Sequence, residues 1–386
     1  MSLKRLRDYR IWDYPVILLL LAAGLSVVGV LVIRSATIGT ADADLYQHQI
    51  MGLSISAGMA VIFSLVDYHL YKKLFPVIWV VIVAILAYVL IAGVVRGGAR
   101  RWIILPAIGQ IQPSEFCKTM LVVFWASLMS VLERDINKAW AVGIIVGTTA
   151  VPLFLIFREP DISTTIVCVL LFAAMIYTAK ISYKWILGVL GVIVPAAGAF
   201  FWYLFANEQE LVEKHYWARR ILAFFRPQQY ADLYYQQENS MMAIGSGGLA
   251  GKGLYTTTFE SVKNGNFLSE AQTDFVFAVV GEELGFLGAA GILCAVLLLI
   301  ILCLNVGRRA PDMCGRLLCT GYAALIGFQT IVNISVATGM MPNTGIPLPF
   351  ISFGTSSLLS AFVGLGIVLN VGLQRKKKEK DDWRVV

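Results

Sequence analysis

Residues 269–286, SEAQTDFVFAVVGEELGF, join a polar segment to a long apolar run that reaches about residue 304. Asp274 stands where the polar segment meets this run, and Glu282 and Glu283 lie inside it. A charge at the centre of a membrane helix costs about 2.5–3.5 kcal/mol on insertion scales, so such acids need a partner, a cavity or a chemical role. The stretch therefore predicts a membrane-spanning fold with a site built around carboxylates.

The composition is that of an integral membrane protein. Hydrophobic residues make up 58% of the 386 positions and charged residues 14%. Apolar runs near the ~20 residues needed to cross a bilayer recur along the chain. The first run is long and lacks a small-residue cleavage site, so we expect no cleavable signal peptide. We predict one polytopic all-α domain over residues 1–386, a bundle of about ten transmembrane helices. The expected spans are 14–34, 49–67, 74–95, 114–132, 139–157, 162–179, 184–205, 274–304, 316–338 and 356–374.

The distribution of lysine and arginine predicts the orientation. Most of the 31 basic residues fall in the segments that share a side with the N-terminus, including the basic tail 375–386. By the positive-inside rule both termini are cytoplasmic, and the long loop 206–273 is extracytoplasmic. The net charge of +7 is explained by anionic membrane lipid and requires no nucleic acid.

Cysteine and histidine patterns indicate neither a metal site nor a disulfide framework. The six cysteines lie in or beside predicted spans or on the inner face, and the three histidines are scattered. Glycine, proline and charge gather instead in the outer segments 96–115, 158–161, 206–273 and 339–355. Long connections between packed helices usually carry function or disorder. We therefore expect the chemistry on the outer face, where ATP is not available.

The first outer segment contains GARRW at 98–102 and QPSE at 112–115. Ser114 is a candidate helix cap, with Glu115 in the first turn and Lys118 three residues further on the same face. A structural ion pair beside an interfacial Trp102 explains these residues. The alternative is a cationic rim for an anionic headgroup, with Arg101 binding phosphate oxygens and Trp102 stacking on a sugar.

Three further outer stretches are distinctive. Pro160 is expected to stop one helix, and Asp161 is a candidate cap for the next. Residues 245–253, GSGGLAGKG, fail the Walker A pattern and fit either a phosphate-binding backbone nest or a flexible turn. Residues 345–357, GIPLPFISFGTSS, are too rich in proline for a regular helix, so we expect a re-entrant wall of the site.

Taken in order, these strings resemble the SEDS family (shape, elongation, division and sporulation proteins) along nearly the whole chain. The resemblance rests on GARRW, QPSE with Lys118, Pro160-Asp161, GSGGLAGKG, TDF at 273–275, GEELG at 281–285, and 345–357. The 245–253 segment looks more like the rod-shape elongation type (RodA) than the division type (FtsW).

The resemblance implies a peptidoglycan glycosyltransferase of the bacterial cytoplasmic membrane, which polymerises lipid II into nascent glycan on the outer face. It implies a class B penicillin-binding protein as partner and Asp274 as the catalytic carboxylate. The sequence departs from the family pattern at Gln272, Glu159, Phe353 and Thr355. None of these changes removes Asp274.

The mechanistic hypothesis gives each candidate a role. Asp274 takes the proton of the acceptor 4-hydroxyl. Burial should raise its pKa and nearby cations should lower it, so the direction stays open. Glu282 and Glu283 are assigned to helix packing or the cavity floor. No cofactor is required, although a divalent cation (Mg²⁺ or Mn²⁺) can share the pyrophosphate charge. Arg101, Lys118 and Lys252 are expected to neutralise pyrophosphate, and the other expected substrate-binding residues are Trp102, Glu115, Asn239, Ser240, Thr273 and Ser352.

Two other classes of protein remain. Buried acids and proline-broken segments also occur in transporters, which would make the chain a lipid II flippase. Against this, the sequence shows no paired broken helices in matching halves, and its polar residues crowd the outer edge. A non-catalytic scaffold for wall synthesis would make Asp274 dispensable.

Overall fold

The computed structural model describes residues 14–38, 40, 42–96, 99–105, 109–214, 216–256, 261, 268 and 270–374. The predicted basic tail 375–386 lies outside this range. The elements are α1 (Val16–Thr37), α2 (Leu45–Leu65), α3 (His69–Ala92), β1 (Val94–Arg96), β2 (Ala99–Leu105), β3 (Gly109–Ile111), α4 (Pro113–Val131), η3 (Glu133–Asp135), α5 (Ala139–Arg158), α6 (Ile162–Thr178), α7 (Tyr183–Ala206), α8 (Glu208–Lys214), α9 (Tyr216–Phe225), α10 (Ala231–Ser246), α11 (Val276–Arg308), α12 (Met313–Ala337) and α13 (Thr355–Leu373).

The prediction of about ten membrane helices is confirmed. Nine helices within the described ranges are long and apolar enough to cross a bilayer, and α6 is a shorter apolar helix. The chain is therefore a multi-pass membrane protein. One part of the fold was not predicted: β1, β2 and β3 form a small antiparallel sheet in the first outer segment.

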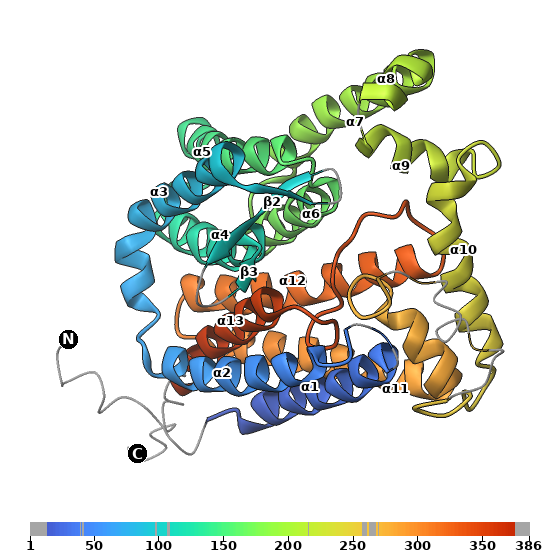
Figure 1. The fold of residues 1–386 in the computed structure, drawn as a ribbon. Helices are drawn as coiled ribbons and strands as arrows, with labels where there is room; N and C mark the ends of the chain where they lie inside the picture. The colour runs from blue at the N-terminus through green and yellow to red at the C-terminus, as the bar shows by residue number, and fades with distance from the viewer. Residues whose placement is uncertain are drawn as a thin grey trace.

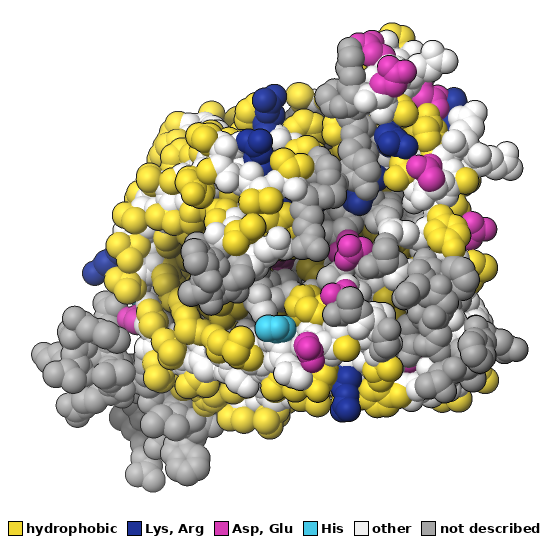
Figure 2. All heavy atoms as spheres, viewed as in Figure 1, with side chains coloured by type: hydrophobic (Ala, Val, Ile, Leu, Met, Phe, Trp, Pro, Cys, Tyr) yellow, Lys and Arg dark blue, Asp and Glu magenta, His cyan; other side chains and the backbone are white. Residues whose placement is uncertain are grey.

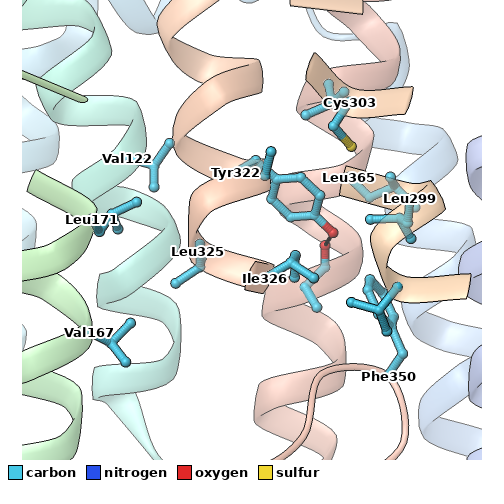
Figure 3. Packing of buried hydrophobic residues seen from close by; sticks show 14 of the residues in the cluster. Val122, Val167, Leu171, Leu299, Cys303, Tyr322, Leu325, Ile326, Phe350 and Leu365 are labelled. Carbon is cyan, nitrogen blue, oxygen red and sulfur yellow. Dashed lines mark hydrogen bonds between the residues drawn. The ribbon is translucent and has the colours of Figure 1, made fainter. Parts of the chain in front are cut away.

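The bundle is organised around α4, α12 and α13 (Figure 1). These helices are the most enclosed, with 83% of the apolar window buried in α4 and α13 and 67% in α12. Figure 3 shows Tyr322 of α12 among side chains of neighbouring helices, and its hydroxyl donates to the Ala361 carbonyl at 2.8 Å. Gly364 allows the close approach, because a Cβ there would lie 2.6 Å from the Tyr322 ring. Small residues at helix contacts are typical of membrane bundles.

Hydrophobic side chains also cover much of the molecular surface seen in Figure 2. Helix α7 is the extreme case, since only 6% of its apolar window is buried within the protein, and it extends away from the bundle in Figure 1. Exposed apolar surface of this extent suits a hydrocarbon solvent and would be costly in water.

The long outer segment 206–273 is largely helical in its described part, where a polar loop was expected. Helices α8, α9 and α10 occupy most of it. The start of α10 docks on the end of α12, where Gln237 donates to the carbonyls of Val336 and Met341 at 2.8 and 2.7 Å. Ser240 donates to the Ala337 carbonyl at 2.7 Å. Helix α10 is thus fixed against the end of α12.

Helix α11 is broken at Gly285, whose φ and ψ are 66° and −166°. Backbone groups released by the break bond to segment 247–253. The amides of Lys252 and Gly253 donate to the carbonyls of Glu282 and Glu283 at 2.9 Å, and Phe286 donates to the Gly248 carbonyl at 2.9 Å. An interrupted helix survives at membrane depth only when its polar groups are satisfied in this way.

We expect Gly285→Ala to lower the thermal stability of the protein strongly. A Cβ at Gly285 would lie 2.3 Å from the Gly251 amide nitrogen, and this backbone conformation alone costs a residue with a side chain about 1–3 kcal/mol. Gly291→Ala in the same helix is the matched control, because a Cβ there meets nothing within 4 Å. Equal melting temperatures for the two purified variants would show that the break is not needed.

Candidate functional site

Asp274 lies in a tight turn, two residues before the start of α11. The amides of Thr273 and Phe275 both donate to the Glu270 carbonyl at 3.2 Å, and α11 begins at Val276. The Asp274 side chain is half-buried. The predicted position of this carboxylate, at the boundary between the polar segment and the apolar helix, matches the structure.

Two buried side chains fix the backbone of this turn to the proline-rich segment 339–355. The Asn333 amide donates to the Asp274 carbonyl at 2.9 Å and to the Ile346 carbonyl at 2.7 Å. The Ser352 hydroxyl donates to the Thr273 carbonyl at 2.7 Å. As predicted, segment 339–355 has no regular helix, and Ile346 and Ser352 are buried. Ser352 and Thr273 therefore help to hold the turn, whichever contacts they make with substrate.

Two arginines lie close to the Asp274 carboxylate. A Cβ at Gly345 would be 2.9 Å from Asp274 Oδ2 and 3.9 Å from Arg220 Nη1, so both side chains border this glycine. Gly345 has a φ of +73°, a conformation that favours glycine. Arg101 and Arg220 both line one narrow pocket of about 30 Å³, formed with Pro160, Ile162, Ser163, Trp217, Ile221, Pro342, Asn343 and Thr344.

The pKa of Asp274 is raised to about 6. Burial is the largest cause and the Glu270 carboxylate adds to it, whereas Arg220 and Arg101 oppose the shift. Burial disfavours the charged form of a carboxyl group, and a neighbouring cation favours it. The balance leaves Asp274 mostly ionised at neutral pH, yet basic enough to accept a proton.

Arg101 is held by the turn between α5 and α6. Its Nε donates to the Glu159 carbonyl at 3.2 Å, Nη2 donates to the Pro160 carbonyl, and Nη1 lies 3.7 Å from Asp161 Oδ1. Asp161 also caps α6, as predicted, by accepting from the Thr164 amide at 3.1 Å. The guanidinium is thus positioned at the mouth of the pocket.

The Glu159 side chain adds no negative charge beside Arg101 and Asp161 at neutral pH. Its side chain is 1% exposed, and its pKa is raised to about 8 by burial and by Asp161, against the opposing effect of Arg101. The group is therefore largely protonated at neutral pH.

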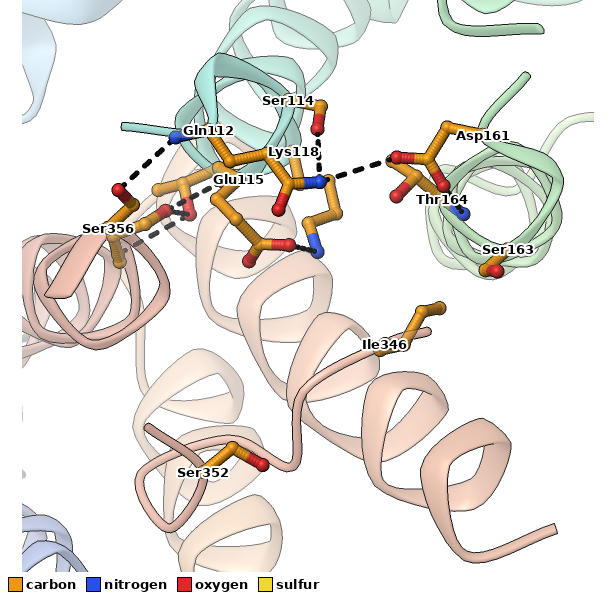
Figure 4. Close-up of polar contacts among 12 residues, drawn as sticks. Gln112, Ser114, Glu115, Lys118, Asp161, Ser163, Thr164, Ile346, Ser352 and Ser356 are labelled. Carbon is orange, nitrogen blue, oxygen red and sulfur yellow. Dashed lines mark hydrogen bonds and ion pairs between the residues drawn. The ribbon is translucent and has the colours of Figure 1, made fainter. Parts of the chain in front are cut away.

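Glu115 and Lys118 form a buried ion pair with an Nζ–Oε1 distance of 2.7 Å and exposed fractions of 4% and 1%. Figure 4 shows both side chains pointing from α4 toward the side on which Ile346 lies. The predicted Ser114 cap is wrong: α4 begins with Pro113 and is preceded by Gln112, because proline suits the first helical position.

The other predicted residues lie further from Asp274 along the outer end. Trp102 is half-buried in β2, and Asn239 and Ser240 are buried in α10. Lys252 pairs with the buried Glu282 at 2.9 Å, which agrees with a packing role for that acid.

A phosphate-binding nest at 245–253 is not formed. The amides of residues 251, 252 and 253 donate to carbonyls of the protein itself. Gly247 and Gly251 allow close backbone contact instead, since a Cβ at Gly251 would lie 2.1 Å from the Glu283 carbonyl oxygen.

Sequence reasoning missed Arg220 and Asn333. Arg220 lies in α9 beside Arg219, within the mixed-charge sequence 208–226. Asn333 is one of two side-chain amides, with Gln329, inside an apolar span. Polar residues inside membrane segments are functional candidates by default, so this signal was available for Asn333.

The model of the FtsW, RodA and SpoVE family of cell cycle proteins matches residues 14–377. The probable peptidoglycan glycosyltransferase FtsW of Trichlorobacter lovleyi is 30% identical over 377 residues, which cover 95% of this chain and 94% of that protein. The peptidoglycan glycosyltransferase MrdB of Escherichia coli K12 is 30% identical over 376 residues, covering 96% and 97%.

Solved structures are similar over nearly the same range. A chain from a peptidoglycan synthase complex that coordinates polymerization and crosslinking superposes with a TM-score of 0.74 at 26% identity, covering 93% of this chain and 97% of its own. The rod shape determining protein RodA of Thermus thermophilus gives a TM-score of 0.69 at 26% identity, covering 94% and 98%.

Proposed function

Because the chain belongs to the FtsW, RodA and SpoVE family of cell cycle proteins, we propose that it is a peptidoglycan glycosyltransferase that polymerises lipid II. The observation that carries the proposal is the Asp274 carboxylate, fixed at the outer end of α11 with a raised pKa and two arginines close by. This arrangement places a base, the Asp274 carboxylate, next to two cations that can bind a pyrophosphate.

In the proposed reaction the 4-hydroxyl oxygen of the acceptor sugar attacks the anomeric carbon of the donor. Asp274 accepts the hydroxyl proton as the new C–O bond forms. The bond from the anomeric carbon to the pyrophosphate oxygen breaks, and the electron pair leaves with undecaprenyl pyrophosphate. One displacement inverts the anomeric centre, which gives a β-1,4 product from an α-linked donor.

Arg101 and Arg220 supply positive charge where the leaving pyrophosphate gains negative charge, and such stabilisation is strongest away from water. A Mg²⁺ or Mn²⁺ ion can share this role. No group of three His, Cys, Asp or Glu side chains suited to a metal occurs among the described residues. The ion would therefore be held mainly by the pyrophosphate, as Mg²⁺ often is.

The proposal places both termini in the cytoplasm and Asp274 on the outer face of the cytoplasmic membrane, on the distribution of Lys and Arg. It takes a class B penicillin-binding protein as partner, supported by the similarity to a peptidoglycan synthase complex.

We assign the protein to the elongation type on the basis of the sequence of segment 245–253. Rescue of a strain depleted of its rod-shape enzyme, and not of one depleted of its division enzyme, tests that assignment.

A lipid II flippase is the second candidate, favoured by the break in α11, since broken helices are typical of transporters. Proteoliposomes with labelled lipid II separate the two functions. Glycan ladders with the wild-type protein, alone or with its partner, support the polymerase. Lipid II that crosses the bilayer without forming glycan supports the flippase.

We expect the polymerisation rate to rise with pH through about 6 and to level off above about 7. A base acts in its deprotonated form, and the pKa of Asp274 is about 6, so the rate should fall about tenfold per pH unit well below it. Initial rates of lipid II consumption between pH 4.5 and 8 measure this. A flat profile across pH 6 would contradict the role of Asp274 as base.

A further inference from the structure

A second, larger pocket of about 660 Å³ lies at the opposite end of the bundle from Asp274. It is formed by the end of α6, the turn into α7, the end of α11 and the start of α12. Helix α6 begins beside Asp161 and runs 17 residues to Thr178, about 25 Å at 1.5 Å per residue. The pocket is therefore separate from the proposed active site.

Three exposed cations line this pocket: Lys180, Arg308 and Arg316. Within the described ranges, none of the three has an ion-pair partner within 4.0 Å. The nearby acids are engaged elsewhere. Asp312 caps α12 and pairs with His69 at 3.3 Å, and Asp135 pairs with Lys138 at 2.8 Å. The pocket thus concentrates positive charge that no acid in the described part of the chain neutralises through an ion pair.

Lys180 occupies a backbone position that favours glycine. Its φ is +60°, its amide donates to the Tyr177 carbonyl at 3.1 Å, and the Ile181 amide donates to the Ile176 carbonyl at 3.3 Å. This pair of bonds is the Schellman motif, in which the left-handed residue is usually glycine. The lysine is therefore not explained by the needs of the turn.

The rim of the pocket is apolar and faces outward. Tyr177 and Tyr183 are 67% and 68% exposed, and Leu304 of α11 is 38% exposed. Further exposed apolar residues continue along both flanking helices, such as Leu187 of α7 and Leu297 of α11. An anion with long apolar chains could thus bind in the pocket and place those chains along these helices.

We propose that this pocket binds the phosphate headgroup of an anionic phospholipid, with its acyl chains against α7 and α11. Lys180, Arg308 and Arg316 contact the phosphate, because basic pockets between helices at the cytoplasmic end suit such headgroups. The positive-inside rule alone would account for scattered surface lysines such as Lys73, but it does not require three cations to converge on one pocket.

The test is lipid binding by purified full-length protein, stripped of lipid in a neutral detergent. Native mass spectrometry with added cardiolipin, phosphatidylglycerol or phosphatidylcholine measures the affinities. We expect saturable binding of the two anionic lipids and at least a tenfold loss of affinity in the double variant Lys180→Gly with Arg316→Gln. Lys180→Gly suits the backbone of the turn, so misfolding is not expected. Lys73→Ala, an exposed cation at the same end, should stay within twofold of wild type.

Three results would overturn the proposal. The double variant could bind cardiolipin as tightly as wild type does. Phosphatidylcholine could bind as tightly as the anionic lipids. Inorganic phosphate at millimolar concentration could displace cardiolipin, which would make the pocket a site for free phosphate. Glycan synthesis by the double variant in detergent should remain near the wild-type rate, and this readout is independent of the lipid measurements.

Discussion

Asp274→Asn is expected to reduce lipid II polymerisation by about 100- to 10,000-fold, the range that a general base contributes. Asparagine is nearly the same size but cannot accept the proton of the acceptor hydroxyl. Its backbone keeps the bond from Asn333 that fixes the turn, so the fold should be retained. Initial rates of glycan formation, together with melting temperatures, measure both effects.

Asp274→Glu and Glu270→Gln complete this series. The glutamate retains a carboxylate but moves it by one methylene, so partial activity is expected. Glu270→Gln removes a charge that raises the pKa of Asp274, and it should shift the pH–rate profile to lower pH while polymerisation continues. Wild-type rates for Asp274→Asn would mean that Asp274 is not the catalytic base, whereas glycan formation by neither protein would leave the scaffold as the better interpretation.

Lys118→Ala is expected to destabilise the protein by about 3–5 kcal/mol, because it leaves the Glu115 carboxylate buried without its counter-charge. Lys138→Ala is the matched control. Lys138 and Asp135 form a pair with the same spacing at 2.8 Å, but their side chains are 64% and 38% exposed, and such surface pairs contribute at most about 1 kcal/mol. Thermal melting of the purified variants compares them.

The double variant Glu115→Gln with Lys118→Met separates a structural role from substrate binding. Removing both charges leaves no unpaired ion in the interior, so stability should return close to that of wild type. If the pair also engages the donor, polymerisation should stay low despite the recovered stability. Full activity in the stable double variant would mean that the pair only holds α4.

The membrane fold could be predicted from the sequence because its signals are local. Runs of about 20 apolar residues fix the spans, and Asp274 is conspicuous as an acid at the edge of one. The sheet of β1, β2 and β3 was missed because two of its strands have only three residues. Strands this short carry too little alternation to be distinguished from a loop.

The parts of the site that could not be predicted depend on contacts between distant segments. Arg220 lies near Asp274 only because α9 lines one pocket with residues 342–344, and a mixed-charge stretch does not indicate which arginine will do so. The sequence around Gly251 and Gly285 does not indicate that these two glycines are in contact, yet the break in α11 packs against the turn after α10 at this point. Lys118 could be placed on the same helix face as Glu115, but its burial depends on the rest of the bundle.

The most direct measurement of the central claim is a single round of sugar transfer by protein already loaded with lipid II, comparing wild type with Asp274→Asn. Lipid II binding is measured in the same samples. We predict that the variant binds lipid II within about threefold of wild type and forms glycan about 100- to 10,000-fold more slowly, since only the proton acceptor is lost. Glycan formation by the variant at more than about a tenth of the wild-type rate would contradict the assignment of Asp274 as the catalytic base.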